Sequence, residues 1–127
     1  MTIEFQRTVP IFRIFSLEKA REFYLDFLGS KVDWEHRFEP DAPVFMQISR
    51  DGLVLHLSEH FGDGTPGSVA YVYMKGVRDL HRDLNGKKCR HMRPGLQQQE
   101  WSMTEPGVID PFNNRIPFGE RTDQISS

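Results

Sequence analysis

The clearest structural signal in this chain lies near its end, in Trp101-Ser-Met-Thr-Glu-Pro-Gly-Val-Ile-Asp-Pro-Phe-Asn-Asn-Arg-Ile-Pro-Phe-Gly-Glu120. The pattern predicts a strand, a tight turn and a second strand, with an aromatic residue at the mouth of the hairpin. Asp110-Pro111 fixes φ at the entry to the turn, and Asn113-Asn114 tolerates the left-handed backbone that a strand-matching turn requires. We therefore expect strands from Trp101 to Ile109 and from Arg115 to Phe118.

Upstream of this hairpin, the first half of the chain predicts the order βαβββ. Residues 9–14 form a short apolar segment that predicts a strand, and Ser16 is a helix N-cap ahead of an apolar stripe at helical spacing. Gly29 is expected to end that helix. Three further strands are expected at Lys31 to Phe38, Val44 to Ser49 and Leu53 to Ser58, with a hairpin turn at Arg50-Asp51-Gly52.

The second half restarts the same order after a loop rich in glycine and proline, Phe61 to Gly67. Its expected elements are a strand from Ser68 to Met74, a helix from Val77 to Leu84, a strand from Lys87 to Met92 and the terminal hairpin. Gln97-Gln98-Gln99 is expected to be loop. The sequence therefore predicts one α+β domain over residues 1–127, in which two βαβββ modules, at about residues 8–60 and about residues 68–120, form a cupped mixed sheet.

Length and composition narrow the class of protein. A chain of 127 residues buries a core without disulfide or metal staples. The net charge of −2, with acids and bases interspersed, gives no field that favours nucleic acid or an anionic membrane. The single cysteine, Cys89, has no internal disulfide partner, residues 1–5 lack a signal-peptide pattern, and no apolar run approaches the roughly 20 residues that span a bilayer. A cytoplasmic protein with neither nucleic-acid nor membrane partners is expected.

Two motifs carry a family resemblance. One is the closing pattern Trp-x-Met-x-x-x-x-Val-x-Asp-Pro-x-x-Asn-Arg-Ile-x-Phe-x-Glu over residues 101–120, and the other is the strand and helix of residues 9–29, which ends Phe-Tyr-x-x-x-Leu-Gly. Together they resemble the glyoxalase and bleomycin resistance superfamily, also called the vicinal oxygen chelate fold. The resemblance implies paired βαβββ modules, a cup-shaped cleft and a homodimer.

Metal-dependent members of that superfamily place four His, Glu or Gln ligands in four strands, all pointing into the cup. The resemblance carries these positions onto Val9, His56, Val69 and Pro117. Only His56 offers a donor atom, and one imidazole does not hold a catalytic divalent ion against water. We therefore expect no metal, no cofactor and none of the isomerase or ring-cleaving dioxygenase chemistry that needs a Lewis acid.

The chain then resembles the bleomycin resistance proteins, which use the same cup to bind a drug between two subunits. In those proteins aromatic residues alternate on the strand that opens the second half, and another stands in the closing motif. The corresponding residues here are Tyr71, Tyr73 and Trp101. Such side chains offer flat, polarizable surface for a planar ligand. The alternative is that they fill the cup or a dimer seam.

His56 is the remaining polar candidate for the cleft. Strand alternation places Leu53, Leu55 and Leu57 against the helices and His56 on the opposite face. There it either contacts a ligand or is satisfied by a neighbour such as a tyrosine hydroxyl.

Further candidate ligand contacts are Trp101 and Met103, which as i, i+2 neighbours are expected to share a face with Glu105 in line. Glu105 either attracts a cation or is simply solvated. Trp34 and Phe38 lie on the strand that would border a partner subunit, and their alternative role is dimer packing.

The sequence thus predicts a non-catalytic, homodimeric protein that sequesters a drug, such as a bleomycin-type glycopeptide, or an aromatic metabolite in an interfacial cleft. The alternative is an enzyme of the superfamily that uses His56 as general base and Tyr71 or Tyr73 as acid on a small carbonyl or aromatic metabolite.

Overall fold

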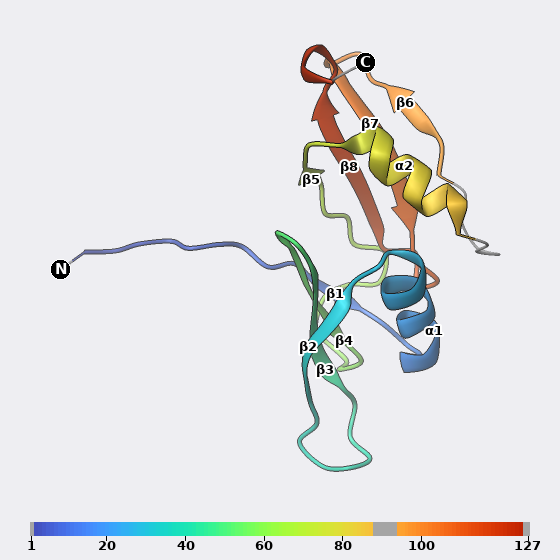
Figure 1. The fold of residues 1–127 in the computed structure, drawn as a ribbon. Helices are drawn as coiled ribbons and strands as arrows, with labels where there is room; N and C mark the ends of the chain where they lie inside the picture. The colour runs from blue at the N-terminus through green and yellow to red at the C-terminus, as the bar shows by residue number, and fades with distance from the viewer. Residues whose placement is uncertain (1, 88–93, 126–127) are drawn as a thin grey trace.

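Two four-stranded mixed sheets make up the computed structural model, which describes residues 2–87 and 94–125 (Figure 1). The strand orders are β1-β4-β3-β2 and β5-β8-β7-β6. In chain order, the first strand of each module pairs in parallel with the last, as β1 with β4 and β5 with β8, and the other pairs are antiparallel. The two sheets repeat one topology, so the predicted α+β class with paired βαβββ modules is confirmed.

The first module follows the sequence prediction closely. Its elements are β1 (Ile11–Arg13), α1 (Leu17–Arg21), the π-helical turn η1 (Glu22–Phe27), β2 (Lys31–His36), β3 (Phe45–Arg50) and β4 (Leu53–Ser58). The Ser16 side chain caps α1 by accepting from the Lys19 N–H at 3.2 Å. Gly29 ends the helical segment at φ 80°, and Asp51 turns the β3–β4 hairpin at φ 52°.

The second module consists of β5 (Val72–Tyr73), α2 (Val77–Gly86), β6 (Leu96–Gln98), β7 (Met103–Ile109), β8 (Arg115–Arg121) and the 3-10 turn η2 (Thr122–Gln124). The strand predicted at Ser68 to Met74 is reduced to β5, preceded by an isolated bridge between Val69 and Arg115. The strand predicted at Lys87 to Met92 lies, apart from Lys87, outside the described residues.

Two predictions for this module were wrong. Gln97 and Gln98, expected in a loop, belong to β6, which pairs with β7 at the edge of the sheet. Their side chains are exposed, so no apolar alternation marks the strand in the sequence. Trp101, expected to begin a strand, lies in the turn before β7, because Ser102 takes φ 65° and reverses the chain there.

One hydrophobic core spans both modules. It joins Phe12, Tyr24 and Leu57 of the first module to Val108 and Ile116 of the second. Leu55 and Leu57 are buried as predicted, whereas His56 between them is not. Since the helical segments and the core cover one face of each sheet, the opposite faces carry the side chains that are free to meet a ligand.

A buried carboxylate in the β7–β8 turn connects the modules. Asp110 Oδ1 accepts from the backbone N–H groups of Phe112 at 2.9 Å and Asn114 at 2.7 Å, and its Oδ2 accepts from the Tyr24 hydroxyl at 2.6 Å. Burial first, and then the Asp110 carboxylate, raise the pKa of the Tyr24 hydroxyl well above its ordinary value. Tyr24 therefore stays a protonated donor that ties η1 to the turn.

Asn114 completes this connection. Its Nδ2 donates to the Arg13 carbonyl of the first module at 2.9 Å, and its Oδ1 accepts from the Ser68 N–H at 3.1 Å. Asn113 takes the left-handed conformation at φ 68° that the sequence predicted for this turn. Asp110 and Asn114 were predicted only as turn residues, and their role between the modules was not.

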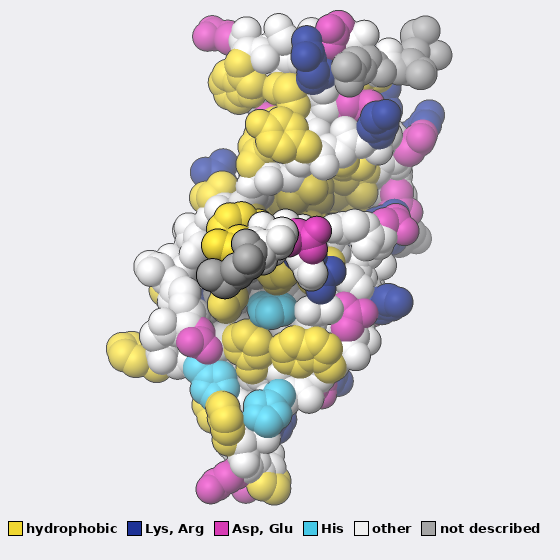
Figure 2. All heavy atoms as spheres, turned by 90° about the vertical axis from the view of Figure 1, so that its left-hand side faces the viewer, with side chains coloured by type: hydrophobic (Ala, Val, Ile, Leu, Met, Phe, Trp, Pro, Cys, Tyr) yellow, Lys and Arg dark blue, Asp and Glu magenta, His cyan; other side chains and the backbone are white. Residues whose placement is uncertain are grey.

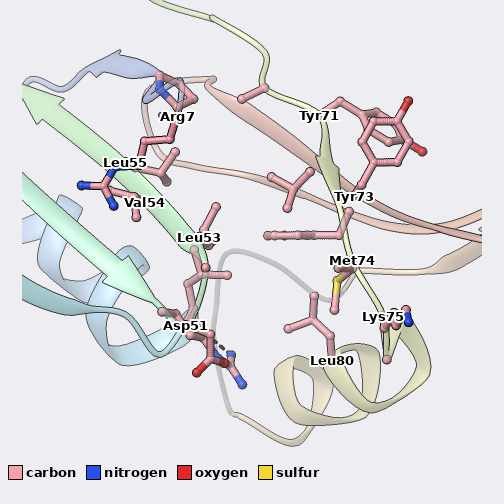
Figure 3. Close-up of a pocket in the computed structure, with 18 of the residues that line it drawn as sticks. Arg7, Asp51, Leu53, Val54, Leu55, Tyr71, Tyr73, Met74, Lys75 and Leu80 are labelled. Carbon is pink, nitrogen blue, oxygen red and sulfur yellow. Dashed lines mark hydrogen bonds between the residues drawn. The ribbon is translucent and has the colours of Figure 1, made fainter. Parts of the chain in front are cut away.

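The surface of the molecule carries an N-terminal arm and a groove between the two modules. Residues 2–8 are exposed, and the N-terminal arm runs away from the body of the molecule (Figure 1). A groove of about 840 Å³ lies between β4 of the first module and β5 and α2 of the second (Figure 3). No helix within residues 2–87 and 94–125 is long and apolar enough to cross a membrane.

Candidate functional site

Two exposed sheet faces carry the side chains that the sequence singled out. The module-1 face is the side of β2, β3 and β4 that bears Trp34, Phe45, Gln47 and His56. The module-2 face lies around β5, β7 and the β6–β7 turn and bears Tyr71, Tyr73, Trp101 and Glu105. Figure 2 shows hydrophobic side chains and histidines gathered on one side of the molecule.

Three rings form the centre of the module-1 face. Trp34 and Phe45 stack with centroids 5.7 Å apart and planes 23° apart. The His56 ring stands edge-on to both, at 5.3 Å from Trp34 and 5.1 Å from Phe45. Alternation along β3 explains the arrangement, since Met46 and Ile48 turn into the core and leave Phe45 on the outer face.

His56 is held by a polar neighbour. Its Nε2 lies 3.1 Å from Gln47 Oε1, so the imidazole is satisfied by an amide and not by a tyrosine hydroxyl. Gln47 Nε2 donates to Asp33 Oδ2, and Ser49 Oγ donates to Asp33 Oδ1, both at 3.0 Å. Neither Gln47 nor Asp33 was recognised in the sequence, because hydrogen-bonding partners on adjacent strands have no fixed spacing along the chain.

The protonation of this group follows from its surroundings. The hydrogen bonds from Gln47 and then Ser49 lower the pKa of Asp33, which is therefore ionised at neutral pH. Partial burial, and then the positive charge of Arg7, lower the pKa of His56 below its ordinary value. His56 is thus a neutral imidazole near pH 7.

Phe38 lies two residues beyond the end of β2, which was predicted to run to Phe38 but ends at His36. It is 76% exposed and stands edge-on to His36 at 4.7 Å and to His60 at 5.8 Å. Trp34, 40% exposed, contacts the His56 cluster instead. The structure therefore places these two candidates in separate aromatic groups.

On the module-2 face, Tyr71 and Tyr73 lie together as the alternation predicts, with ring centroids 5.0 Å apart. The Tyr71 hydroxyl donates to Glu105 Oε2 at 2.5 Å, and the Trp101 side chain lies close enough to the same hydroxyl to act on its pKa. Gln99 Nε2 donates to Glu105 Oε1 at 3.3 Å. Glu105 is therefore not merely solvated but held beside three aromatic residues.

Tyr71 owes its position to a glycine. A Cβ added at Gly119 of β8 would lie 2.0 Å from the Tyr71 hydroxyl oxygen, so only a residue without a side chain leaves room for the ring. Partial burial and the hydrogen bond to Glu105 raise the pKa of the Tyr71 hydroxyl to about 12. Sequence reasoning missed Gly119, although a glycine inside a strand signals close approach.

Trp101 and Met103 do not share a face, contrary to expectation. Trp101 is 62% exposed, whereas Met103 is only 7% exposed. The positive φ of Ser102 breaks the strand alternation between them. Trp101 thus stands on the surface near Tyr71, whereas Met103 is buried.

The positions inherited from metal-dependent relatives are distributed over both modules. Val69 and Pro117 line one pocket of about 380 Å³ together with Glu105 and Arg115. His56 belongs to the first module. Its backbone N–H donates to the carbonyl of Pro10, the neighbour of Val9, at 3.0 Å. Within residues 2–87 and 94–125, no three His, Cys, Asp or Glu side chains converge in a way that could hold a metal ion.

The larger groove between the modules has an apolar floor with charged residues at its margins. Leu53, Leu55, Leu80 and Phe118 line it, and Figure 3 shows β4 and β5 facing each other across it. Arg50 lies at its end, where the guanidinium donates to Asp83 of α2 at 3.1 Å. Tyr71 and Tyr73 border this groove, which therefore adjoins the module-2 face.

Comparisons with known proteins agree with this geometry. A family model described as glyoxalase superfamily protein matches residues 1–124. The bleomycin resistance protein of Geobacillus stearothermophilus is 25% identical in an alignment 126 positions long, which covers 88% of this chain and 94% of that protein. A bleomycin resistance protein of Staphylococcus aureus matches with the same identity and coverage.

Solved structures share the fold. A bleomycin-binding protein crystallised with bleomycin superposes with a TM-score of 0.69 at 16% identity, over 91% of this chain and 98% of that one. The bleomycin-binding protein of Streptomyces verticillus with copper(II)-bleomycin gives a TM-score of 0.65 at 22% identity, over 92% of this chain and 97% of that one.

Proposed function

This chain belongs to the glyoxalase superfamily, and we propose that it acts within that family as a non-catalytic protein that binds and sequesters a small molecule with planar aromatic groups. A bleomycin-type glycopeptide is the first ligand to test, since relatives along most of the chain are named bleomycin resistance proteins. We place this activity in the cytoplasm and assign both modules to one functional domain.

The exposed aromatic cluster of the module-2 face carries the proposal. Tyr71, Tyr73 and Trp101 gather around the Glu105 carboxylate, and the Tyr73 ring is 80% exposed. Large aromatic side chains left in solvent lose burial energy unless something covers them, and their faces suit stacking on planar groups. The carboxylate and the Gln99 amide add polar contacts that can orient such a ligand.

A homodimer supplies the second wall of the cleft in this proposal. Each sheet face is open on one side, and apolar surface is left exposed by Trp34 on the module-1 face and by Phe38 beyond the end of β2. A second copy can bring its module-1 face against the module-2 face of the first by two-fold symmetry. Light scattering tests this. Phe38→Ser is expected to shift the protein toward monomer, and Phe61→Ser, which changes an exposed loop phenylalanine, is the control. A wild-type monomer at micromolar concentration contradicts it.

Enzymatic use of His56 has less support within one chain. The contacts of His56 are Trp34, Phe45 and Gln47 of the first module. The two candidate acids, Tyr71 and Tyr73, both belong to the second module. Tyr71 donates to Glu105, and its pKa of about 12 makes it a weak acid at neutral pH. Binding therefore remains the proposed function.

Titration with metal-free and copper(II)-loaded bleomycin tests the proposal. Both tryptophans are partly exposed, so a planar group that stacks on either one is expected to change the fluorescence. A ligand present at 100 times its Kd raises the free energy of unfolding by about 2.7 kcal/mol, which a thermal shift detects. The absence of any shift or fluorescence change with both forms of the drug contradicts bleomycin as the ligand, and the same result with a panel of aromatic metabolites contradicts binding as the function.

A further inference from the structure

Three polar side chains of the module-1 face are linked by hydrogen bonds whose donors and acceptors are fixed. Asp33 accepts from Gln47 Nε2, and the other end of the same amide, Oε1, lies 3.1 Å from His56 Nε2. These residues stand on β2, β3 and β4, so three adjacent strands each contribute one member.

The order of donors and acceptors in these hydrogen bonds decides the tautomer of His56. An ionised carboxylate only accepts hydrogen bonds, so Asp33 requires the NH₂ group of Gln47 to point toward it. The amide oxygen of Gln47 then faces His56, and an oxygen at 3.1 Å requires a proton on Nε2. In a neutral imidazole the lone pair consequently lies on Nδ1.

That nitrogen is open to a partner. Across the described part of the chain, the side-chain nitrogens and oxygens that are both buried and unpartnered are Ser30 Oγ and His60 Nε2. His56 Nδ1 is not among them, and the ring's hydrogen bond is made through Nε2, so Nδ1 reaches solvent. The charged groups that act on this network are Arg7 on the arm and Lys31 on β2, and neither is an acceptor.

We propose that Asp33 and Gln47 are positioning residues that fix His56 as its Nε2–H tautomer, so that Nδ1 is presented on the module-1 face as the acceptor for an N–H or O–H donor of the ligand. This rests on the proposed function in one respect, namely that the ligand touches this face. Trp34 and Phe45 border the imidazole, and their rings suit a donor carried by a planar heteroaromatic or amide group.

The tautomer is measurable without any ligand. Long-range proton–nitrogen NMR spectra distinguish a protonated ring nitrogen from one with a free lone pair. At pH 7.5 wild-type His56 is expected to show a protonated Nε2 and a free Nδ1. Asp33→Asn, whose amide can accept or donate, and Gln47→Leu are expected to give a mixture of both tautomers. Ser49→Ala removes the other bond to Asp33 but not the one from Gln47, so it keeps the wild-type pattern.

Two results overturn the inference at this stage. One is a wild-type His56 protonated mainly on Nδ1, and the other is a tautomer that Asp33→Asn and Gln47→Leu leave unchanged. His81 on α2 serves as the internal reference that the variants are folded, because its signals report a helix remote from this sheet.

A matched pair of probes tests the class of ligand group. Indole carries an N–H donor and a planar ring, whereas 1-methylindole keeps the ring without the donor. Indole is expected to bind at least about fivefold more tightly and to shift the His56 Nδ1 resonance. Equal affinities, or no binding by indole up to its solubility limit, overturn the acceptor role. Bleomycin binding that survives either result shows that the proposed function stands while this inference fails.

Discussion

The two modules share one topology but present different chemistry on their exposed faces. On the module-1 face the polar side chains bond to one another, as the chain from Asp33 through Gln47 to His56 shows. On the module-2 face the Tyr73 ring is 80% exposed beside Tyr71, and Tyr71 and Gln99 both donate to a single carboxylate, that of Glu105. The first face is a pre-ordered polar site with aromatic borders, and the second is a stacking surface.

Strand pairing explains the difference. The strands β2, β3 and β4 each have six residues and pair antiparallel, continuously between β3 and β4 and with a register shift between Val32 and Trp34 of β2. Asp33 lies at that shift, where its carboxylate accepts from Gln47 and Ser49 of β3. In contrast, β5 has two residues, and Gly119 on its neighbour β8 leaves the space that Tyr71 occupies. A repeated topology therefore does not produce a repeated site. The length of each strand, and a glycine that leaves room for a neighbouring ring, decide which side chains can meet.

The largest expected effect concerns the contact that makes the two modules one folding unit. Asp110→Ala removes a buried acceptor of four hydrogen bonds and leaves the Tyr24 hydroxyl without its partner. We expect the free energy of unfolding to fall by about 3 kcal/mol or more, as measured by chemical denaturation. If both modules belong to one cooperative structure, the variant unfolds in a single transition at lower denaturant concentration.

Tyr24→Phe is the matched control, since it removes one hydroxyl and keeps the ring in the core. Its expected cost is about 1 to 2 kcal/mol. Two separate unfolding transitions in the wild type, or a loss below about 1 kcal/mol for Asp110→Ala, would show that the modules fold independently.

The second expected effect separates a binding surface from a packed core. Trp101→Ala and Tyr73→Ala are each expected to weaken bleomycin binding about tenfold, because each removes a stacking partner. Neither should lower the apo melting temperature appreciably, since both side chains are mostly exposed. Calorimetric titration and a thermal melt of the same samples supply both measurements.

A different outcome has a clear meaning. Loss of a core tryptophan costs roughly 3 to 5 kcal/mol, so a collapsed melting temperature for Trp101→Ala would show that this residue packs the protein in solution. Unchanged affinity in both variants would move the ligand to the module-1 face or to the groove between the modules.

A smaller effect is expected from Gly119→Ala, which tests why the second face differs from the first. The backbone of Gly119 does not take a positive φ, so the added methyl group acts by displacing the Tyr71 ring. We expect the hydrogen bond from the Tyr71 hydroxyl to Glu105 to break and bleomycin affinity to fall about threefold. Gly52→Ala, in a turn with open space around it, is the control.

Spectrophotometric titration reports the same displacement. The Tyr71 component, identified by difference from Tyr71→Phe, titrates near pH 12 in the wild type and is expected to move down toward 10 in Gly119→Ala. A component that stays near pH 12 would mean that Tyr71 keeps its place and that the glycine is not required for it.

The sequence predicted those features that depend on local pattern. The Ser16 cap, the end of the helical segment at Gly29 and the β3–β4 hairpin are each set by residues close together in the chain. The alternation that brings Tyr71 and Tyr73 together is equally local. For these elements, sequence spacing and spatial neighbourhood are nearly the same thing.

Features that depend on pairing across the fold could not be predicted. Asp33 and Gln47 are 14 residues apart, and Tyr24 and Asp110 are 86 apart, so no spacing rule connects them. The edge strand β6 was missed because both of its glutamines face solvent. Ser102 was missed because a non-glycine residue at positive φ has only a weak sequence signal.

The smallest expected effect is a pH dependence confined to the module-1 face. The acceptor on His56 exists only in the neutral ring, and its lowered pKa, due to partial burial and then Arg7, keeps that form present to lower pH than in an ordinary histidine. Indole does not titrate in this range, so its affinity reports the protein alone. Between pH 7.5 and pH 6.5 we expect a loss of less than about twofold, followed by a decline at lower pH. His81→Gln, on α2, should leave the profile unchanged.

The sign also holds for stability. Because the folded protein binds a proton at His56 less readily than the unfolded chain, this group's contribution is present above pH 6.5 and is lost as the pH falls through the folded pKa. The positive charge of Arg7 favours the neutral ring of His56, and Lys31 and Arg7 together favour the ionised carboxylate of Asp33. Indole affinity that rises on acidification, or that stays constant down to pH 5, would show that Nδ1 is not an acceptor.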